Sequence, residues 1–120
     1  MGLWDRVRAA VTRGGPRARA MTSRDADARY LAEWVRARTG VEGFLEPKTT
    51  VTDVTVVLVA GDGEWTRRVV GERGARRLAA DLRIPVHDVG RTGYPQRMRD
   101  HDARRRVERR RAFEEDLRDL

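Results

Sequence analysis

The chain contains no cysteine, so disulfide bonds and thiolate chemistry are excluded, and a reducing compartment suits it. No apolar run approaches the roughly 20 residues of a membrane-spanning helix, so we expect no integral membrane association. The N-terminal stretch MGLWDRVRAAV has no long apolar core and no cleavage-like site, which argues against secretion. These absences predict a cytoplasmic protein.

Lysine and aromatic residues are also scarce. Lys48 stands alone beside 25 arginines, and aromatic residues make up 6% of the 120 residues. The codon usage of a GC-rich genome explains such a ratio, so arginine in place of lysine is not by itself a sign of phosphate recognition. Hydrophobic residues reach 39%, which is enough for one modest core in a single domain.

The basic charge is concentrated at two segments of the chain. Residues 1–20 carry a net charge of +4 and residues 91–111 carry +6, whereas residues 112–120 carry −3. The segment between them is neutral, although the whole chain carries +7. The sequence therefore predicts a neutral central domain with basic flanks.

Residues 1–13 are predicted to form an amphipathic helix, followed by a linker over residues 14–22. The apolar side chains of this helix recur at helical spacing, and its arginines lie off the apolar stripe. Two interpretations stay open. The helix packs on its own domain, or it docks on a partner protein or a membrane surface. The side chains that would dock are Leu3, Trp4, Val7 and Val11.

Residues 23–97 are predicted to form a single α/β domain that begins with a helix. Ser23 is a suitable N-cap, the helix runs to about Arg38, and Gly40 is a suitable stop. The apolar residues within 30–35 are expected to face inward.

A hairpin of two strands is the next expected feature. Residues 51–60, VTDVTVVLVA, end in a continuous apolar run, which is typical of a central strand buried on both faces. Gly61-Asp62-Gly63 forms the turn, and EWTRRVV returns as the partner strand. The earlier segment GFLEP, residues 43–47, ends in proline and is expected to be an edge strand.

A helix over 74–83 and a strand over 85–89 predict a right-handed crossover, and residues 98–120 predict a basic C-terminal helix. The fold class is therefore α/β, of the mixed α+β kind. We expect a small three- to four-stranded mixed sheet with a β-hairpin and a βαβ crossover, flanked by N- and C-terminal helices.

The order helix, three strands, helix, strand over residues 23–89 resembles the core of the PD-(D/E)xK nucleases. In that family an aspartate opens the second strand, and an acid-x-lysine motif lies on the third, around a metal ion. Asp53 falls near the first position, but the third strand offers Arg67-Arg68-Val69 where the acid and the lysine would stand. The resemblance implies a nuclease-like scaffold without the catalytic motif, and a scaffold alone carries no function.

The stretches EPKTTVTDVTVVLVAGDGEWTRR, IPVHDV and GYPQRMRDHDARRR resemble a family of short, basic, uncharacterised actinobacterial proteins. The resemblance covers most of residues 41–110. Members of that family sometimes carry an automated oxidoreductase label. The chain offers no dinucleotide fingerprint, cysteine pair or flavin site, so this resemblance implies no particular site residue.

No catalytic, metal or cofactor site can be assembled from the sequence, and we expect none. His87 and Asp88 are neighbours on a strand and should point to opposite faces of the sheet. No set of residues has the spacing of metal ligands. The glycines of GDGEW and GRTG match neither the Rossmann fingerprint nor the P-loop. A small enzyme of unknown type stays as an alternative, with the polar candidates Asp53, Asp62, Glu64, His87 and Asp88.

The stretch GRTGYPQRMR, residues 90–99, is interpreted as a joint between the domain and the C-terminal helix. Tyr94 and Pro95 are expected to anchor the turn against the core. Beyond it, residues 104–111 hold six arginines within eight residues, which creates a strong local field. Three interpretations of the tail stay open: a solvated helix, an arm that contacts nucleic-acid phosphates, or a surface for an acidic protein, including another copy's acidic end.

We predict a non-enzymatic binding protein that contacts the phosphates of RNA, DNA or a nucleoprotein such as the ribosome. The side chains expected to make these contacts are Arg91, Arg97, Arg99, Arg104, Arg105, Arg109 and Arg111. The alternative function is a protein–protein adaptor that docks through the N-terminal helix and the charged tail. The oligomeric state stays open.

Overall fold

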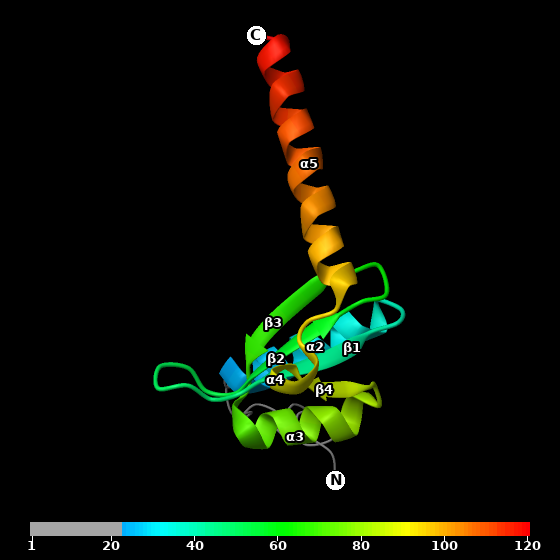
Figure 1. Cartoon of the computed structure of the whole chain (residues 1–120). Coiled ribbons are helices and arrows are strands. Elements are labelled where there is room, and N and C mark those ends of the chain that lie inside the picture. Colours follow the sequence, from blue (N-terminus) through cyan, green and yellow to red (C-terminus); the bar gives the residue numbers. More distant parts are fainter. Residues whose placement is uncertain (1–22) are drawn as a thin grey trace, which may run out of the picture.

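The computed structural model describes residues 23–120. The predicted N-terminal helix and linker, with the docking candidates Leu3, Trp4, Val7 and Val11, lie outside the described residues. The elements follow one another in the order helix, three strands, helix, strand and two helices (Figure 1). Their bounds are α2 Ser23–Arg36, β1 Glu42–Glu46, β2 Thr55–Val59, β3 Trp65–Val69, α3 Gly71–Leu82, β4 Val86–Asp88, α4 Val89–Thr92 and α5 Gln96–Arg118.

The four strands form one mixed sheet in the order β3-β2-β1-β4. The pairs β1–β2 and β2–β3 are antiparallel, while β4 runs parallel to β1 after the crossover through α3. The predicted fold class is therefore confirmed, with four strands. The prediction of an edge strand at GFLEP is wrong, because β1 lies between β2 and β4. Pro47 follows the last residue of β1, so it removes no ladder hydrogen bond.

One face of the sheet, which we call the helix-covered face, packs against α2 and α3. Leu31 and Trp34 of α2 join Ala75 and Leu78 of α3 in the main core. Strands alternate their side chains between the two faces, so every second residue of β2 enters this core, as do the residues that directly follow β2 and β3. The sheet contributes Val56, Leu58, Ala60 and Val70.

The opposite face, which we call the joint face, is covered by the chain that leaves β4. Phe44, Val57 and Val59 are buried there against Val89, Tyr94 and Met98. The central strand is therefore apolar on both faces, as its continuous run predicts: all five residues of β2 are buried. The outer strand is less covered, because Trp65 and Val69 stay 36% and 42% exposed.

The predicted turn and helix boundaries need small corrections. α3 begins at Gly71, earlier than expected, because Gly71 adopts a φ of +75° that lets the chain turn directly from β3 into the helix. The single turn α4, which begins one residue before GRTG, was not predicted; the Asp88 side chain caps it by accepting a hydrogen bond from the Gly90 amide. α5 begins at Gln96, just after Pro95.

α5 leaves the body of the protein as a single projecting helix (Figure 1). With 23 residues it is about 34 Å long at the usual rise per residue. None of its residues is buried. In the described part of the chain, no helix is long and apolar enough to cross a membrane.

Candidate nucleic-acid interface

The base of α5 is held on the joint face by Arg97. Its guanidinium donates hydrogen bonds to the backbone oxygens of Ala60, at 2.9 Å, and Val59, at 3.4 Å. It also forms an ion pair with Glu42 on β1, at 2.8 Å. These three contacts join the first turn of α5 to the end of β2 and to β1. The side chain of Arg97 therefore holds the base of α5 against the sheet.

The β2–β3 turn packs against the first turns of the same helix at Gly63. This residue is buried and has a φ of +92°. A Cβ atom built on it would overlap the carbonyl oxygen of Arg97 and lie 2.8 Å from the Cβ of His101. The backbone of α5 can rest on the hairpin only because no side chain stands at this position.

Tyr94 fixes the joint between α4 and α5. Its ring packs beside Phe44, with 5.9 Å between ring centroids, and its hydroxyl donates to the carboxylate of Glu46, which also pairs with Arg67. Burial and the nearby carboxylate both raise the pKa of Tyr94 above its ordinary value. The expectation that Tyr94 anchors the turn against the core is confirmed.

Glu42 joins β4 and α5 on the joint face. Its carboxylate lies 2.7 Å from Nε2 of His87 and 2.8 Å from the guanidinium of Arg97. The hydrogen bond from His87 lowers the pKa of Glu42, burial opposes this, and the hydrogen bond and positive charge of Arg97 lower the pKa further. Since Glu42 and Glu46 alternate with Phe44 along β1, all three point to one face. Neither glutamate was predicted as a functional residue, although the alternation of polar and apolar residues along this strand was the available signal.

We expect the contribution of Glu42 to stability to depend on pH. Its pKa is lowered in the folded state, so the carboxylate stabilises the fold above its ordinary pKa of 4.5, and this contribution is lost as the pH falls through the lowered value. Glu42→Gln should therefore cost stability at pH 7 and cost less near pH 3. Urea unfolding of both proteins at each pH measures the difference. An equal cost at both pH values would contradict the ion-pair explanation.

The remaining predicted contact residues lie along the joint and α5. Arg91 and Arg99 are exposed, and Arg99 donates to the side-chain oxygen of Gln96 at 2.7 Å. Arg104 reaches back to the backbone oxygen of Asp62 on the hairpin at 3.0 Å. Arg105 lies 3.6 Å from Glu108, in a pair that is more than half exposed. Beyond the base of the helix the arginines point into solvent.

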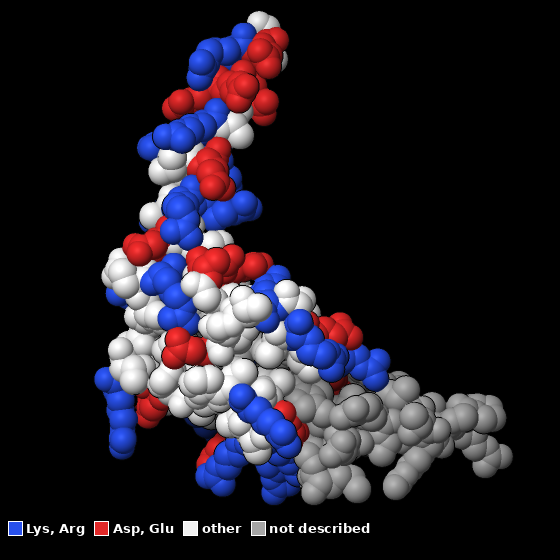
Figure 2. Space-filling view, turned by 90° about the vertical axis from the view of Figure 1, so that its right-hand side faces the viewer, with Lys and Arg blue, Asp and Glu red and all other residues white. Residues whose placement is uncertain are grey.

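Several arginines close to the sheet are paired with carboxylates. In the body these are Arg24 with Asp53, Arg38 with Glu64, Arg67 with Glu46, Arg68 with Asp27 and Arg76 with Glu72; at the base of α5, Arg97 pairs with Glu42. Within the described residues, Arg106, Arg109, Arg110 and Arg111 have no such partner. Figure 2 shows basic side chains along the projecting helix and acidic ones gathered toward its tip.

The polar residues proposed for an enzyme are engaged in separate structural contacts. Asp53 pairs with Arg24, and Glu64 forms a two-point ion pair with Arg38. The Asp62 carboxylate accepts from the backbone amide of Glu64, and Asp88 caps α4. His87 bonds Glu42. Among residues 23–120, no three histidine, aspartate or glutamate side chains lie together so that they could hold a metal ion.

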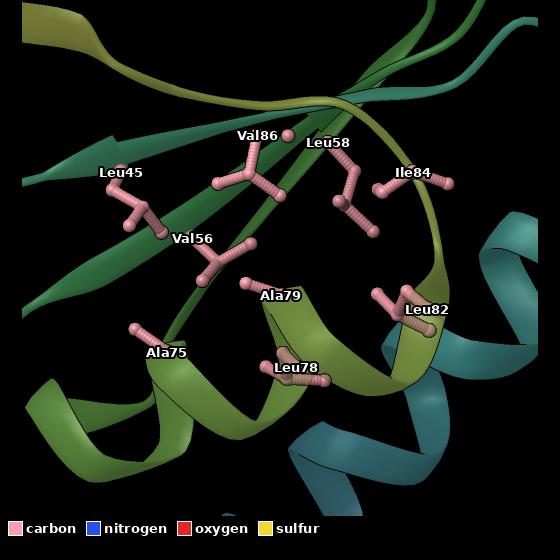
Figure 3. Close-up of a pocket in the computed structure, with 10 residues that line it drawn as sticks. Leu45, Val56, Leu58, Ala75, Leu78, Ala79, Leu82, Ile84 and Val86 are labelled. Carbon is pink, nitrogen blue, oxygen red and sulfur yellow. The ribbon is translucent and has the colours of Figure 1, made fainter.

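The cavity between α3 and the helix-covered face is too small for a ligand. It is lined only by apolar side chains, including Leu58, Leu78 and Ile84, and its volume is about 10 Å³ (Figure 3). A space of that size holds at most one water molecule. An open hollow of about 350 Å³ beside the hairpin is lined by Arg38 and Glu64, which already neutralise one another.

Comparison with protein-family models, with curated proteins and with solved structures finds no match to this chain. The resemblances suggested by the sequence therefore stay predictions, and the function has to be inferred from the geometry of the chain's own residues.

Proposed function

We propose that the protein binds nucleic acid through its projecting C-terminal helix, by contacts to backbone phosphates. The observation that carries the proposal is where unpaired arginines gather. Five arginines of the body and Arg97 at the base of α5 are paired with carboxylates. Residues 104–111, in contrast, place six exposed arginines on a helix that stands away from the body, and within the described residues only Arg105 of these six has an ion-pair partner. Unneutralised guanidinium groups on a convex element bind phosphate well, because they need no rearrangement and can form bidentate hydrogen bonds.

The shape of α5 suits a groove or a phosphate backbone. At 100° per residue, the arginines between 104 and 111 point to several sides of the helix, so a helix lying along nucleic acid would meet phosphates on both flanks. The major groove of DNA admits one α-helix. Arg91 and Arg99 extend the basic surface toward the joint, while Arg97 is left out because its guanidinium is occupied by Glu42 and Ala60.

Base-specific recognition is not part of the proposal. The only aromatic side chain on the projecting helix is Phe113, and Tyr94 is held in the core by Phe44 and Glu46. The helix therefore offers few aromatic side chains on which nucleic-acid bases could stack. We expect binding that is insensitive to sequence and that weakens steeply with salt, as counterion release requires.

The test changes Arg104, Arg105, Arg109 and Arg111 together to glutamate. Glutamate forms helix about as well as arginine, so α5 should persist, which circular dichroism can confirm. Fluorescence anisotropy with a labelled DNA duplex and a labelled RNA, measured from about 50 to 200 mM salt, should show strong binding by the natural chain and only weak binding by the variant, at the lowest salt. If four phosphate contacts are lost, the dependence of affinity on salt should fall by about one unit of slope for each.

A matched control changes four exposed arginines of the body, Arg36, Arg73, Arg76 and Arg83, to glutamate. This variant has the same net charge as the first but keeps α5 intact. It should retain most of the affinity, because the proposal assigns binding to the location of the charge. If both variants lost the same affinity for nucleic acid, net charge alone would explain the loss, and the assignment to α5 would be wrong. If the first variant bound as tightly as the natural chain, the proposal would also be overturned.

A further inference from the structure

The outer half of α5 exposes apolar side chains that nothing in the described part of the chain covers. Phe113 is 62% exposed, Leu117 is 51% exposed and Leu120 is 99% exposed. A single helix in water is marginally stable, because its stability usually comes from packing an apolar face. The charge order of α5 does not help it, since arginines fill the early turns and acids the last ones, against the helix dipole.

These apolar residues belong to one stripe with a heptad spacing, which two arginines interrupt. At 3.6 residues per turn, the stripe occupies an arc of about 100°. Its members are Ala103, Arg106, Arg110, Phe113, Leu117 and Leu120. The side chains that hold the base of α5 to the body, among them Met98 and His101, are centred about 130° away around the helix. The stripe therefore faces away from the protein's own sheet and is free for another molecule.

The charges of the two halves of this segment are complementary to each other. Residues 103–111 carry a net charge of +5 and residues 112–120 carry −3. If two copies of α5 lay side by side in parallel, Arg106 and Arg110 would each face their own counterparts, and like charges would repel. If the two copies ran antiparallel, each basic half would lie against an acidic half.

We propose that the protein forms a homodimer in which the outer parts of two α5 helices pack antiparallel along this stripe. The helical segment from Ala103 to Arg118 is about 24 Å long, enough for a little over four turns of contact. Phe113 of one copy packs beside the stem of the partner's Arg110, and Leu117 packs beside the partner's Arg106. Glu114 and Asp116 meet the partner's Arg110 and Arg109, so Arg110, one of the two arginines that interrupt the stripe, is neutralised in the pair, as is its neighbour Arg109.

This dimer is compatible with phosphate binding but does not depend on it. In the heptad, Arg104, Arg105 and Arg111 lie on the outer surface of the helix pair, so they stay available. The dimer would present two such sets, one near each end of the paired helices. Failure of dimerisation and failure of nucleic-acid binding can be observed separately. The dimer variant changes Phe113 and Leu117 and leaves every arginine in place, and Arg109 is the one phosphate-contacting residue that also takes part in the helix pair.

The first test measures the mass of the full chain by sedimentation equilibrium at rising concentration. We expect reversible dimers, and we expect Phe113→Ala with Leu117→Ala to raise the dimer dissociation constant by about tenfold or more, because it removes the two central apolar side chains. The matched control is Glu115→Ala with Arg118→Ala, which changes exposed residues off the stripe and leaves the net charge unaltered. A natural chain that stays monomeric up to about 1 mM would overturn the proposal.

The second test determines the direction of the pair by disulfide formation. Because the chain has no cysteine, each introduced thiol is the only one present. A protein with Leu117→Cys is mixed with one carrying Arg106→Cys under mild oxidation. The antiparallel pair predicts a mixed disulfide between the two proteins. If each variant instead crosslinks only with itself, the helices run parallel, and the proposed arrangement is wrong.

Discussion

Gly63→Ala is expected to lower the free energy of unfolding by about 3 kcal/mol and to loosen the attachment of α5. Two physical costs add at this position. A side chain at a φ of +92° is strained by about 1–3 kcal/mol. Its Cβ would also overlap the carbonyl of Arg97, and the helix would have to move to make room. Thermal and urea unfolding measure the loss of stability.

Gly93→Ala provides a matched control for this variant. Gly93 also has a positive φ, of +64°, but a Cβ there would meet nothing within 4 Å. The control therefore has only the conformational cost, and it should destabilise the protein by about 1–2 kcal/mol. If the two alanine variants had equal free energies of unfolding, the inference that α5 packs closely on the hairpin at Gly63 would be wrong.

Leu58→Ala is expected to destabilise the protein by about 3–4 kcal/mol. Leu58 has no exposed surface and lies between α3 and the helix-covered face, among the side chains of the main core. Removing its isobutyl group loses the transfer free energy and leaves a void that the surrounding strands cannot close. The void would add to the small cavity already lined by this side chain (Figure 3).

Val51→Ala is the control for the core variant. Val51 is 91% exposed in the loop before β2, so its truncation should change the free energy of unfolding by less than about 0.5 kcal/mol. Urea unfolding of the two variants beside the natural chain makes the comparison. A loss below about 1 kcal/mol for Leu58→Ala would show that this core is loosely packed.

Local patterns in the sequence were sufficient to predict most of the elements. The continuous apolar run of β2, the turn at Gly61-Asp62-Gly63 and the stripe of α3 each identify an element from residues close together in the chain. β3 alternates in the same way: Thr66 and Arg68 contact Tyr30 and Asp27 of α2, whereas Trp65 and Arg67 lie on the other face of the sheet. Such patterns work because a helix or strand repeats its side-chain directions at a fixed period.

The candidate interface was predicted less completely. The basic segment was predicted to lie on a C-terminal helix, and the structure shows that α5 projects into solvent. It also grouped Arg97 with these arginines, whereas its guanidinium faces Glu42 and Ala60. The sequence does not show which of several neighbouring arginines forms an ion pair. That depends on the positions of carboxylates that are distant in the chain and are brought close only by folding.

The sequence by itself determined the composition of each element, the neutral core domain and the location of the unbalanced positive charge. Only the tertiary structure decided that β1 lies inside the sheet, that Gly63 supports α5, and that Arg97 is paired with Glu42 while Arg106, Arg109, Arg110 and Arg111 have no carboxylate partner within the described residues. The physical reason is that each of these facts depends on contacts between residues far apart in the chain. Strand order, close backbone approach and ion pairing are set when the elements pack together. The periodic pattern of side chains within a single helix or strand therefore does not predict them.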